Sequence, residues 1–316
     1  MSTFRNHLPQ LDAPVFLTDG GCETTLVFHD GFDLPDFAAF PLLGDAAGRA
    51  ALDRYLDAYA AVALRDGTGI VLESVTWRAS ADWGARLGYD AAALDAANRD
   101  AIDQVLDARR RHQTSTTPVV VSGNIGPRGD GYVVGATMSA DEARAYHASQ
   151  VRTFASTDAD LVTAMTMTYA DEAVGIATAA AEAAIPVVIS FTVETDGSLP
   201  SGEALGDAIA AVDAATGGYP AYFMVNCAHP THFAHLFDPA PAWASRIGGI
   251  RANASTMSHA ELDAAEDLDR GDPDDLAERY LALSRLLPEL RVLGGCCGTD
   301  HHHVGAISAA CKVAAA

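Results

Sequence analysis

The stretch Arg291-Val292-Leu293-Gly294-Gly295-Cys296-Cys297-Gly298-Thr299 joins a short apolar run to a glycine-rich turn, and the alanine-rich stretch 302–313 follows it. A short apolar run bounded by glycine is typical of a buried strand, and the stretch after it predicts a helix. The cysteines stand where the strand ends. The chain therefore closes with a strand–helix unit that carries its reactive side chains at the carboxyl end of the strand.

The same strand–helix pattern recurs along the whole chain. We expect strands at 15–19, 69–76, 118–123, 160–165, 186–193, 221–227, 247–253 and 291–296. Helix-prone stretches follow them at 47–65, 91–111, 140–156, 171–184, 203–215, 231–245, 274–286 and 302–313. Eight such units predict an α/β fold, a closed parallel (β/α)8 or TIM barrel, as a single domain over residues 1–316. An open doubly wound sheet is the alternative.

Composition excludes several classes of protein. The 316 residues are 49% hydrophobic, and 20 basic residues stand against 42 acidic ones, a net charge of −22. So acidic a surface is unsuited to nucleic acid or to anionic membranes. No apolar run reaches the ~18 residues that a membrane helix requires. The five cysteines are an odd number and no signal-peptide pattern precedes them, so we expect a cytoplasmic protein with reduced thiols.

Polar residues gather at the predicted strand ends, where a (β/α)8 barrel carries its functional site. They are Asp19, Glu73, Asn124, Cys227, Asn253 and the adjacent pair Cys296 and Cys297. The three cysteines predict a three-thiolate Zn²⁺ site, provided that the backbone turns sharply between the adjacent pair. Tetrahedral zinc then keeps a fourth position open, which indicates catalysis. A substrate thiol bound there would lose its proton and become a nucleophile.

The cysteine motifs at 226–227 and 294–299 resemble those of the homocysteine S-methyltransferase family. Segments 18–21, 76–80 and 122–127 resemble motifs at the first, second and third strands of that family, and the likeness runs from residue 15 to 310. The resemblance implies a zinc barrel that methylates the sulfur of a thiol amino acid. By the same resemblance Cys227, Cys296 and Cys297 are the zinc ligands and catalytic centre, and Asp19 holds the ammonium group of the substrate.

The fourth strand departs from the family pattern. The resemblance implies a glutamate there that also contacts the ammonium group, but this chain has Met165. Either Glu23 or Glu73 compensates, or the acceptor is a thiol or selenol other than L-homocysteine. The other expected substrate-binding residues are Thr76, Trp77, Asn124 and Asn253.

The methyl donor is expected to be a cation. No glycine-rich dinucleotide loop follows a strand, so the common AdoMet-binding fold is not indicated. Onium donors such as S-methylmethionine or AdoMet are stabilised by aromatic faces. The candidate aromatic residues are Trp77, Trp83, Tyr89, Tyr132 and Tyr169. The expected reaction transfers a methyl group to L-homocysteine and gives methionine, by a monomer or a simple homodimer.

Two other classes of function stay open. A non-catalytic zinc-binding barrel would close its metal site with a fourth protein ligand such as Cys22, and a zinc hydrolase would need a general base near the metal. We expect 301–303, three histidines, to begin the last helix outside the zinc shell. His229, His232 and His235 are expected to share one helix face near Cys227. Cys311 is expected in the core.

Overall fold

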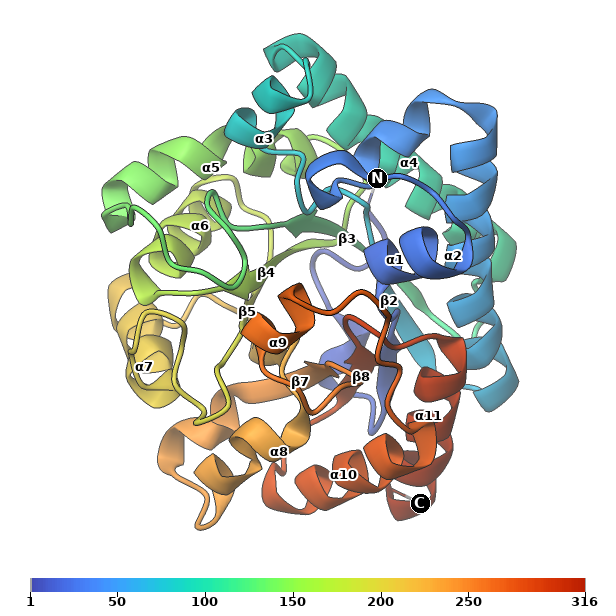
Figure 1. The fold of residues 1–316 in the computed structure, drawn as a ribbon, viewed down its shortest axis with the longest axis vertical. Coiled ribbons are helices and arrows are strands. Elements are labelled where there is room, and N and C mark those ends of the chain that lie inside the picture. Colours follow the sequence, from blue (N-terminus) through green and yellow to red (C-terminus); the bar gives the residue numbers. More distant parts are fainter. Residues whose placement is uncertain (1, 316) are drawn as a thin grey trace.

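The computed structural model describes residues 2–315, with side chains described through Lys312. Its eight parallel strands form a closed barrel in the order β1 to β8. Strand β1 (Phe16–Thr18) pairs with β2 (Gly69–Glu73) on one side and with β8 (Val292–Gly295) on the other. The predicted (β/α)8 barrel is confirmed, and the open sheet is wrong because the first and last strands are bonded to each other. Figure 1 shows the ring of helices around the barrel.

Every predicted strand is present, with ends that shift by a few residues. The remaining strands are β3 (Val119–Ile125), β4 (Leu161–Met167), β5 (Val187–Phe191), β6 (Phe223–Asn226) and β7 (Ile247–Ala252).

Seven of the eight predicted helices are present. They are α2 (Ala46–Asp66), α4 (Ala91–His112), α5 (Ala140–Ala155), α6 (Ala170–Glu182), α7 (Leu205–Thr216), α10 (Pro273–Leu286) and α11 (His301–Ala315). Local signals explain their ends. Ser139 and Glu142 form a capping box at the start of α5, and the side chain of Asp272 caps α10. None of the described helices is both long and apolar enough to cross a membrane.

The predicted helix 231–245 is wrong. The segment is divided into α8 (Pro230–Phe233) and two 3-10 turns, η5 (Ala234–Phe237) and η6 (Ala242–Arg246). Pro239 and Pro241 lie between the two turns, and proline removes a helical hydrogen bond and clashes with the preceding turn.

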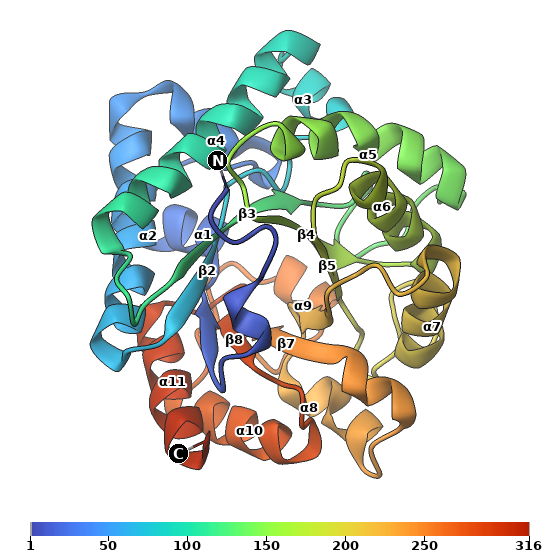
Figure 2. The ribbon, with the colours of Figure 1, turned by 180° about the vertical axis from the view of Figure 1, so that it is seen from behind.

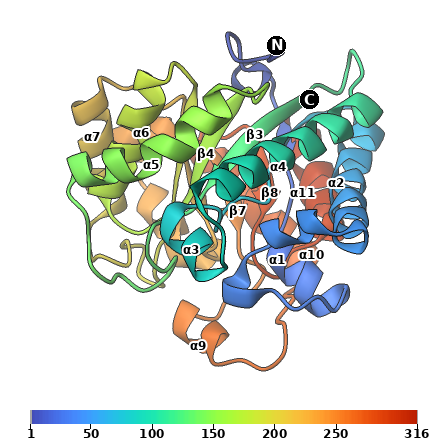
Figure 3. The same ribbon diagram turned by 90° about the horizontal axis from the view of Figure 1, so that it is seen from above.

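Short elements that the sequence pattern did not predict lie ahead of β1 and in the loops between strands and helices. They are helices α1 (Cys22–Thr24), α3 (Ala81–Arg86) and α9 (His259–Asp263), the π-helical turn η2 (Thr25–His29), and the 3-10 turns η1 (Pro9–Leu11), η3 (Pro35–Phe37) and η4 (Phe40–Gly44). Helix α9 lies within the β7–α10 loop, residues 253–272. Figure 3 shows α9 projecting from the end of the barrel opposite the N-terminus.

The barrel interior is apolar at one end and polar at the other. The apolar layer includes Phe16, Val71, Val120, Leu161, Val188, Met224 and Val292, which form one buried cluster. Residues two positions further along these strands face the same side. Six of them are polar, namely Thr18, Glu73, Ser122, Thr163, Ser190 and Asn226, and the seventh is Gly294. The apolar layer stabilises the barrel, and the polar layer forms the floor of the functional end.

The N-terminal segment covers the apolar end of the barrel, as Figure 2 shows from behind. Leu8 belongs to the interior apolar cluster, and the backbone N–H groups of Thr3 and Phe4 donate to Asp160 Oδ1 at 2.9 and 2.8 Å. The pocket that holds the polar side chains lies at the opposite end, at the carboxyl ends of the strands.

Candidate metal centre and adjoining pockets

Three sulfur atoms meet at the carboxyl ends of β6 and β8. The Sγ atoms of Cys227, Cys296 and Cys297 all lie within 4.8 Å of one another. Cys227 follows β6 in the left-handed region, with a φ of 55°, which costs a non-glycine residue about 1–2 kcal/mol. This conformation turns the chain away from the strand direction directly after Asn226.

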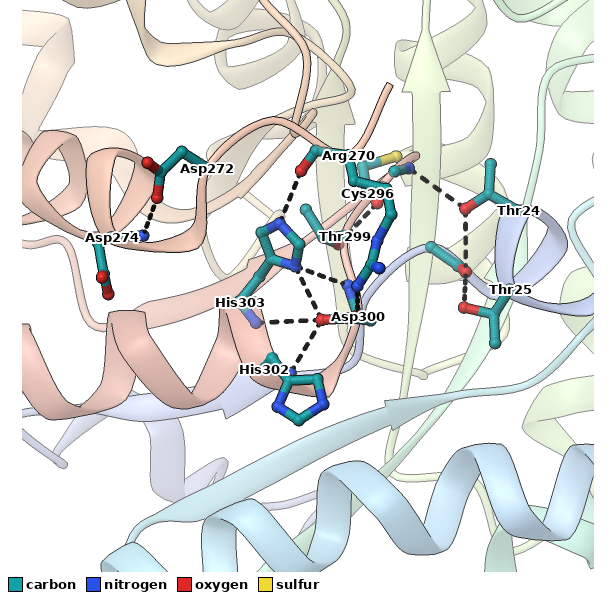
Figure 4. A network of polar contacts seen from close by, with 12 residues as sticks. Thr24, Thr25, Arg270, Asp272, Asp274, Cys296, Thr299, Asp300, His302 and His303 are labelled. Carbon is teal, nitrogen blue, oxygen red and sulfur yellow. Dashed lines mark hydrogen bonds and ion pairs between the residues drawn. The ribbon is translucent and has the colours of Figure 1, made fainter. Parts of the chain in front are cut away.

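The predicted sharp turn after β8 is present. Gly298 has a φ of 76°, and the N–H of Thr299 donates to the carbonyl of Cys296 at 3.1 Å. A positive φ at the third position of such a turn favours glycine. The hydroxyl of Thr299 also donates to this carbonyl at 2.7 Å, and the N–H of Gly298 donates to Thr24 Oγ1 at 3.2 Å (Figure 4). These bonds hold both adjacent cysteines toward Cys227.

The electrostatics of the three thiols fit a divalent cation. Contacts from Cys296 and Cys297 lower the pKa of Cys227 well below its usual range, whereas the nearby Cys227 raises the pKa of both partners. One thiolate therefore opposes ionisation of the next, as expected for like charges at close range. A bound cation removes this conflict, and three sulfur donors suit a soft or borderline metal.

Polar groups surround the sulfur atoms. The hydroxyl of Tyr132, from the loop after β3, lies 3.0 Å from Sγ of Cys227 and 3.8 Å from Sγ of Cys297. Burial raises the pKa of this phenol well above its usual range, so it remains a donor. The amide nitrogens of Asn226 and Asn253 lie 3.8 Å from Cys296 Sγ and 3.7 Å from Cys227 Sγ, respectively. Hydrogen bonds of this kind, made to a metal ligand by groups that do not bind the metal themselves, orient the ligand.

An inner pocket lies beside the sulfur atoms and reaches into the barrel. It brings together most of the expected substrate-binding residues with two of the cysteines. They are Asp19, Glu23, Glu73, Trp77, Asn124 and Met165, together with Cys296 and Cys297. Thr76 does not line it, because its buried hydroxyl donates to the carbonyl of Asn124 at 2.7 Å.

Sequence reasoning missed Arg251, which lines the same pocket. Its Nη2 lies 2.5 Å from Oδ1 of Asp19, and both side chains are buried. A signal for this residue exists in the sequence. A lone arginine stands in the apolar run of β7, two positions before Asn253, so both side chains point to the same side of the strand.

An outer pocket of about 350 Å³ adjoins the inner one. The two pockets share Phe37, Trp77, Tyr132 and Cys297. The outer pocket also contacts Cys227 and Asn253, and the β7–α10 loop supplies one wall of it. His259 of α9 fixes that wall, because its Nε2 contacts the carbonyl of Cys227 at 2.8 Å and its ring lies 4.6 Å from the ring of Tyr132.

The aromatic residues after β2 already have partners. The guanidinium of Arg78 lies 3.9 Å from the ring centre of Trp77 and 3.8 Å from that of Trp83. Tyr89 packs edge-on against Phe40 at 4.9 Å. Of the five aromatic candidates, Trp77 and Tyr132 are the two that line both pockets.

The histidines have structural contacts. His303 lies in the first turn of α11, where its Nδ1 contacts Asp300 at 2.8 Å and its Nε2 contacts the carbonyl of Arg270 at 2.8 Å (Figure 4). These contacts, with the ion pair between Arg270 and Asp300, attach the β7–α10 loop to α11. The expectation that 301–303 begin the last helix is confirmed.

The expectation that His229, His232 and His235 share a helix face is wrong. His229 precedes α8 as its N-cap, and His235 lies in η5, because the predicted helix is interrupted. Cys22 lines the inner pocket but is not part of the sulfur cluster, and Cys311 is buried in the core.

Comparison with known proteins supports the fold and identifies the family. The family model described as homocysteine S-methyltransferase matches residues 16–311. The homocysteine methyltransferase MmuM from Escherichia coli, in its oxidized form, is 20% identical, with 95% of this chain and 99% of that chain covered and a TM-score of 0.73. Its metallated form is 19% identical, with 96% and 98% covered and a TM-score of 0.73. No curated relative matches this sequence.

At such identities the likeness to solved structures supports the fold, whereas the family model covers nearly the whole chain, including all three clustered cysteines. The chain belongs to the homocysteine S-methyltransferase family, a family of enzymes.

Proposed function

We propose that this protein is a zinc-dependent S-methyltransferase that moves a methyl group from an onium donor to the sulfur of a small thiol. L-homocysteine is the leading acceptor, and S-methylmethionine or AdoMet is the leading donor. The observation that carries the proposal is the position of the sulfur cluster. Three cysteine Sγ atoms converge between two pockets that share Cys297, so an acceptor and a donor can approach one centre from two sides.

Cys227, Cys296 and Cys297 would hold the Zn²⁺ ion. Zinc with three protein ligands supplies an open position and a field that lowers the pKa of a bound thiol. Tyr132 and the two asparagines keep the cysteine sulfurs oriented through their contacts at 3.0 to 3.8 Å. The inner pocket orients the rest of the acceptor.

The charge of the outer pocket suits a cationic donor. Asp130, Asp263, Asp267 and Asp269 line it, together with the aromatic rings of Phe28, Phe37, Trp77 and Tyr132. Carboxylates and aromatic faces both stabilise a sulfonium or quaternary ammonium group. Arg78 is the one basic side chain of the described lining besides His259. Its guanidinium lies over the indole rings of Trp77 and Trp83 and 3.9 Å from Asp130, so Asp263, Asp267 and Asp269 supply most of the negative charge of the lining.

The transfer balances without a general acid. The acceptor releases its thiol proton to solvent on binding, and its sulfur then attacks the methyl carbon of the donor. The donor's bond from sulfur to methyl breaks, and its electron pair stays on the departing sulfur. The products are a thioether and a neutral sulfide, so the protein contributes alignment and activation of the nucleophile.

Turnover by the zinc-loaded protein tests this proposal. We expect deuterium-labelled methyl groups from S-methylmethionine or AdoMet to appear in methionine when L-homocysteine is supplied. Cys297→Ser should abolish transfer, whereas Cys311→Ala, which changes a buried thiol outside the cluster, should retain it. Absence of labelled product with both donors, from protein that holds its metal, would contradict the proposal for this acceptor. A thiol-independent hydrolysis would instead favour a zinc hydrolase.

A further inference from the structure

Arg251 and Asp19 form a buried ion pair across the top of the barrel. Arg251 belongs to β7, Asp19 follows β1, and β8 lies between these two strands. The inward position of β8 is Gly294, which carries no side chain to separate them. Besides the 2.5 Å contact with Asp19, Nη2 of Arg251 donates to the carbonyl of Gly20 at 3.3 Å. Asp19 therefore already faces a buried cation, and its Oδ1 makes no hydrogen bond to any described residue.

Two nitrogen atoms of the same guanidinium have no such partner. Nε and Nη1 of Arg251 are buried and make no hydrogen bond to any residue that the structure describes. Arg251 is only 5% exposed, yet it lines the inner pocket with Cys296. A buried donor without a partner is costly, so these N–H groups are expected to be satisfied by what the pocket holds.

The guanidinium stays charged in this environment. Burial opposes its charge, but Asp19 and Glu73 raise the pKa of Arg251 above its usual range, with smaller contributions from Tyr55 and Cys296. Glu73 lines the same pocket, where burial raises the pKa of its carboxyl against the smaller opposing effect of Ser122 and Thr163. The planar, doubly donating edge of an arginine matches a carboxylate better than any other common group.

We propose that Arg251 binds a carboxylate of the thiol acceptor, and that Asp19 is the counter-ion of this arginine and not the ligand of a substrate ammonium group. The inference rests on the proposed function, since it names the chemical class of its acceptor, a thiol carboxylic acid. Met165 is consistent with this assignment, because a pocket that anchors a carboxylate does not require a second acid on β4. An α-ammonium group, where present, meets Glu23, which lines the same pocket.

A series of three thiols tests the inference on the unaltered zinc-loaded protein. L-homocysteine has both charged groups, 4-mercaptobutanoate lacks the ammonium, and 3-aminopropane-1-thiol lacks the carboxylate. Calorimetric titration should give dissociation constants for the first two within about fivefold of each other. The aminothiol should bind at least about tenfold more weakly, because it loses a charge-assisted contact. Equal or tighter binding of the aminothiol, or no binding of 4-mercaptobutanoate, would overturn the inference.

Variants of the ion pair between Arg251 and Asp19 provide a second test of the inference. The double variant Asp19→Asn with Arg251→Gln removes both charges together and leaves no unpaired buried ion. It should bind 4-mercaptobutanoate and the aminothiol with similar affinity, while propane-1-thiol binds as in the parent protein. Arg251→Lys, which keeps the charge but loses the forked edge, should weaken only the carboxylic thiols. If the double variant fails to fold, the ligand series on the parent protein still decides.

Binding tests the role of Arg251, and turnover tests the proposed function independently of it. If the thiols bind in the expected order but no methyl group is transferred, the proposed function is wrong and the role of Arg251 stands. If methyl transfer occurs and the aminothiol is preferred, the function stands and the role of Arg251 is wrong.

Discussion

The hydroxyl of Tyr132 lies 3.0 Å from Sγ of Cys227, so a hydrogen bond joins the loop after β3 to the sulfur cluster. The same ring packs against His259 of α9, and both side chains line the outer pocket beside the cluster. This tyrosine is therefore both a second contact of a candidate metal ligand and part of the outer pocket.

Tyr132→Phe tests this contact, since it keeps the ring and removes only the hydroxyl. Second contacts of metal ligands are typically worth 10- to 100-fold in metal affinity or activity. In competition with a chromophoric chelator, we expect the variant to bind zinc about 10-fold more weakly than the parent protein. Tyr219→Phe, whose hydroxyl donates to the backbone carbonyls of Ala180 and Ile185, is the matched control and should leave metal affinity unchanged. Unchanged affinity in Tyr132→Phe would contradict the role given to its hydroxyl.

Glu73 makes stability depend on pH. Burial raises the pKa of this carboxyl to about 7 in the folded protein, so the folded state holds its proton more tightly than the unfolded chain. The contribution of this carboxyl to the free energy of unfolding is fully present below its pKa in the unfolded chain and is lost as the pH rises through about 7. Relative to Glu73→Gln, the parent protein should lose roughly 1–3 kcal/mol of unfolding free energy between about pH 5 and pH 8. Urea unfolding of both proteins at both pH values measures this, and parallel pH profiles would contradict it.

Gly294 leaves the space in which the first and last strands meet. A Cβ atom there would lie 1.8 Å from Thr18 Oγ1 and 2.9 Å from the carbonyl of Asp19. Gly294→Ala should therefore destabilise the protein by at least about 1–3 kcal/mol, or prevent folding. At Gly44 a Cβ atom would meet nothing within 4 Å, so Gly44→Ala should change the unfolding midpoint little. Equal unfolding midpoints for the two variants would contradict the close packing of β1 against β8 at Gly294.

The barrel could be predicted because its signals are local and repeated. Each apolar run is short, each following stretch is alanine-rich, and caps such as Ser139 and Asp272 mark helix starts. The meeting of Cys227 with Cys296 and Cys297 follows from the same pattern, because the carboxyl ends of parallel strands lie at one end of a barrel. The interruption of the predicted helix 231–245 can also be inferred from the sequence, because Pro239 and Pro241 lie within it.

The ion pair of Arg251 could not be assigned in the same way. Its partner depends on barrel closure, which brings β7 and β1 to either side of β8, and on the absence of a side chain at Gly294. The position of Tyr132 depends on a loop without periodicity, whose path is set by contacts with the cluster and with His259. Loop paths and charge pairing arise from tertiary contacts that no local pattern encodes.

X-ray absorption at the zinc edge, with and without L-homocysteine, decides whether the metal keeps a position for the acceptor sulfur. We expect one zinc per chain with three sulfur ligands in the resting protein, and four sulfur ligands when the acceptor is bound. A resting site that already has four protein ligands, or a sulfur count that stays at three when the thiol is added, would contradict it.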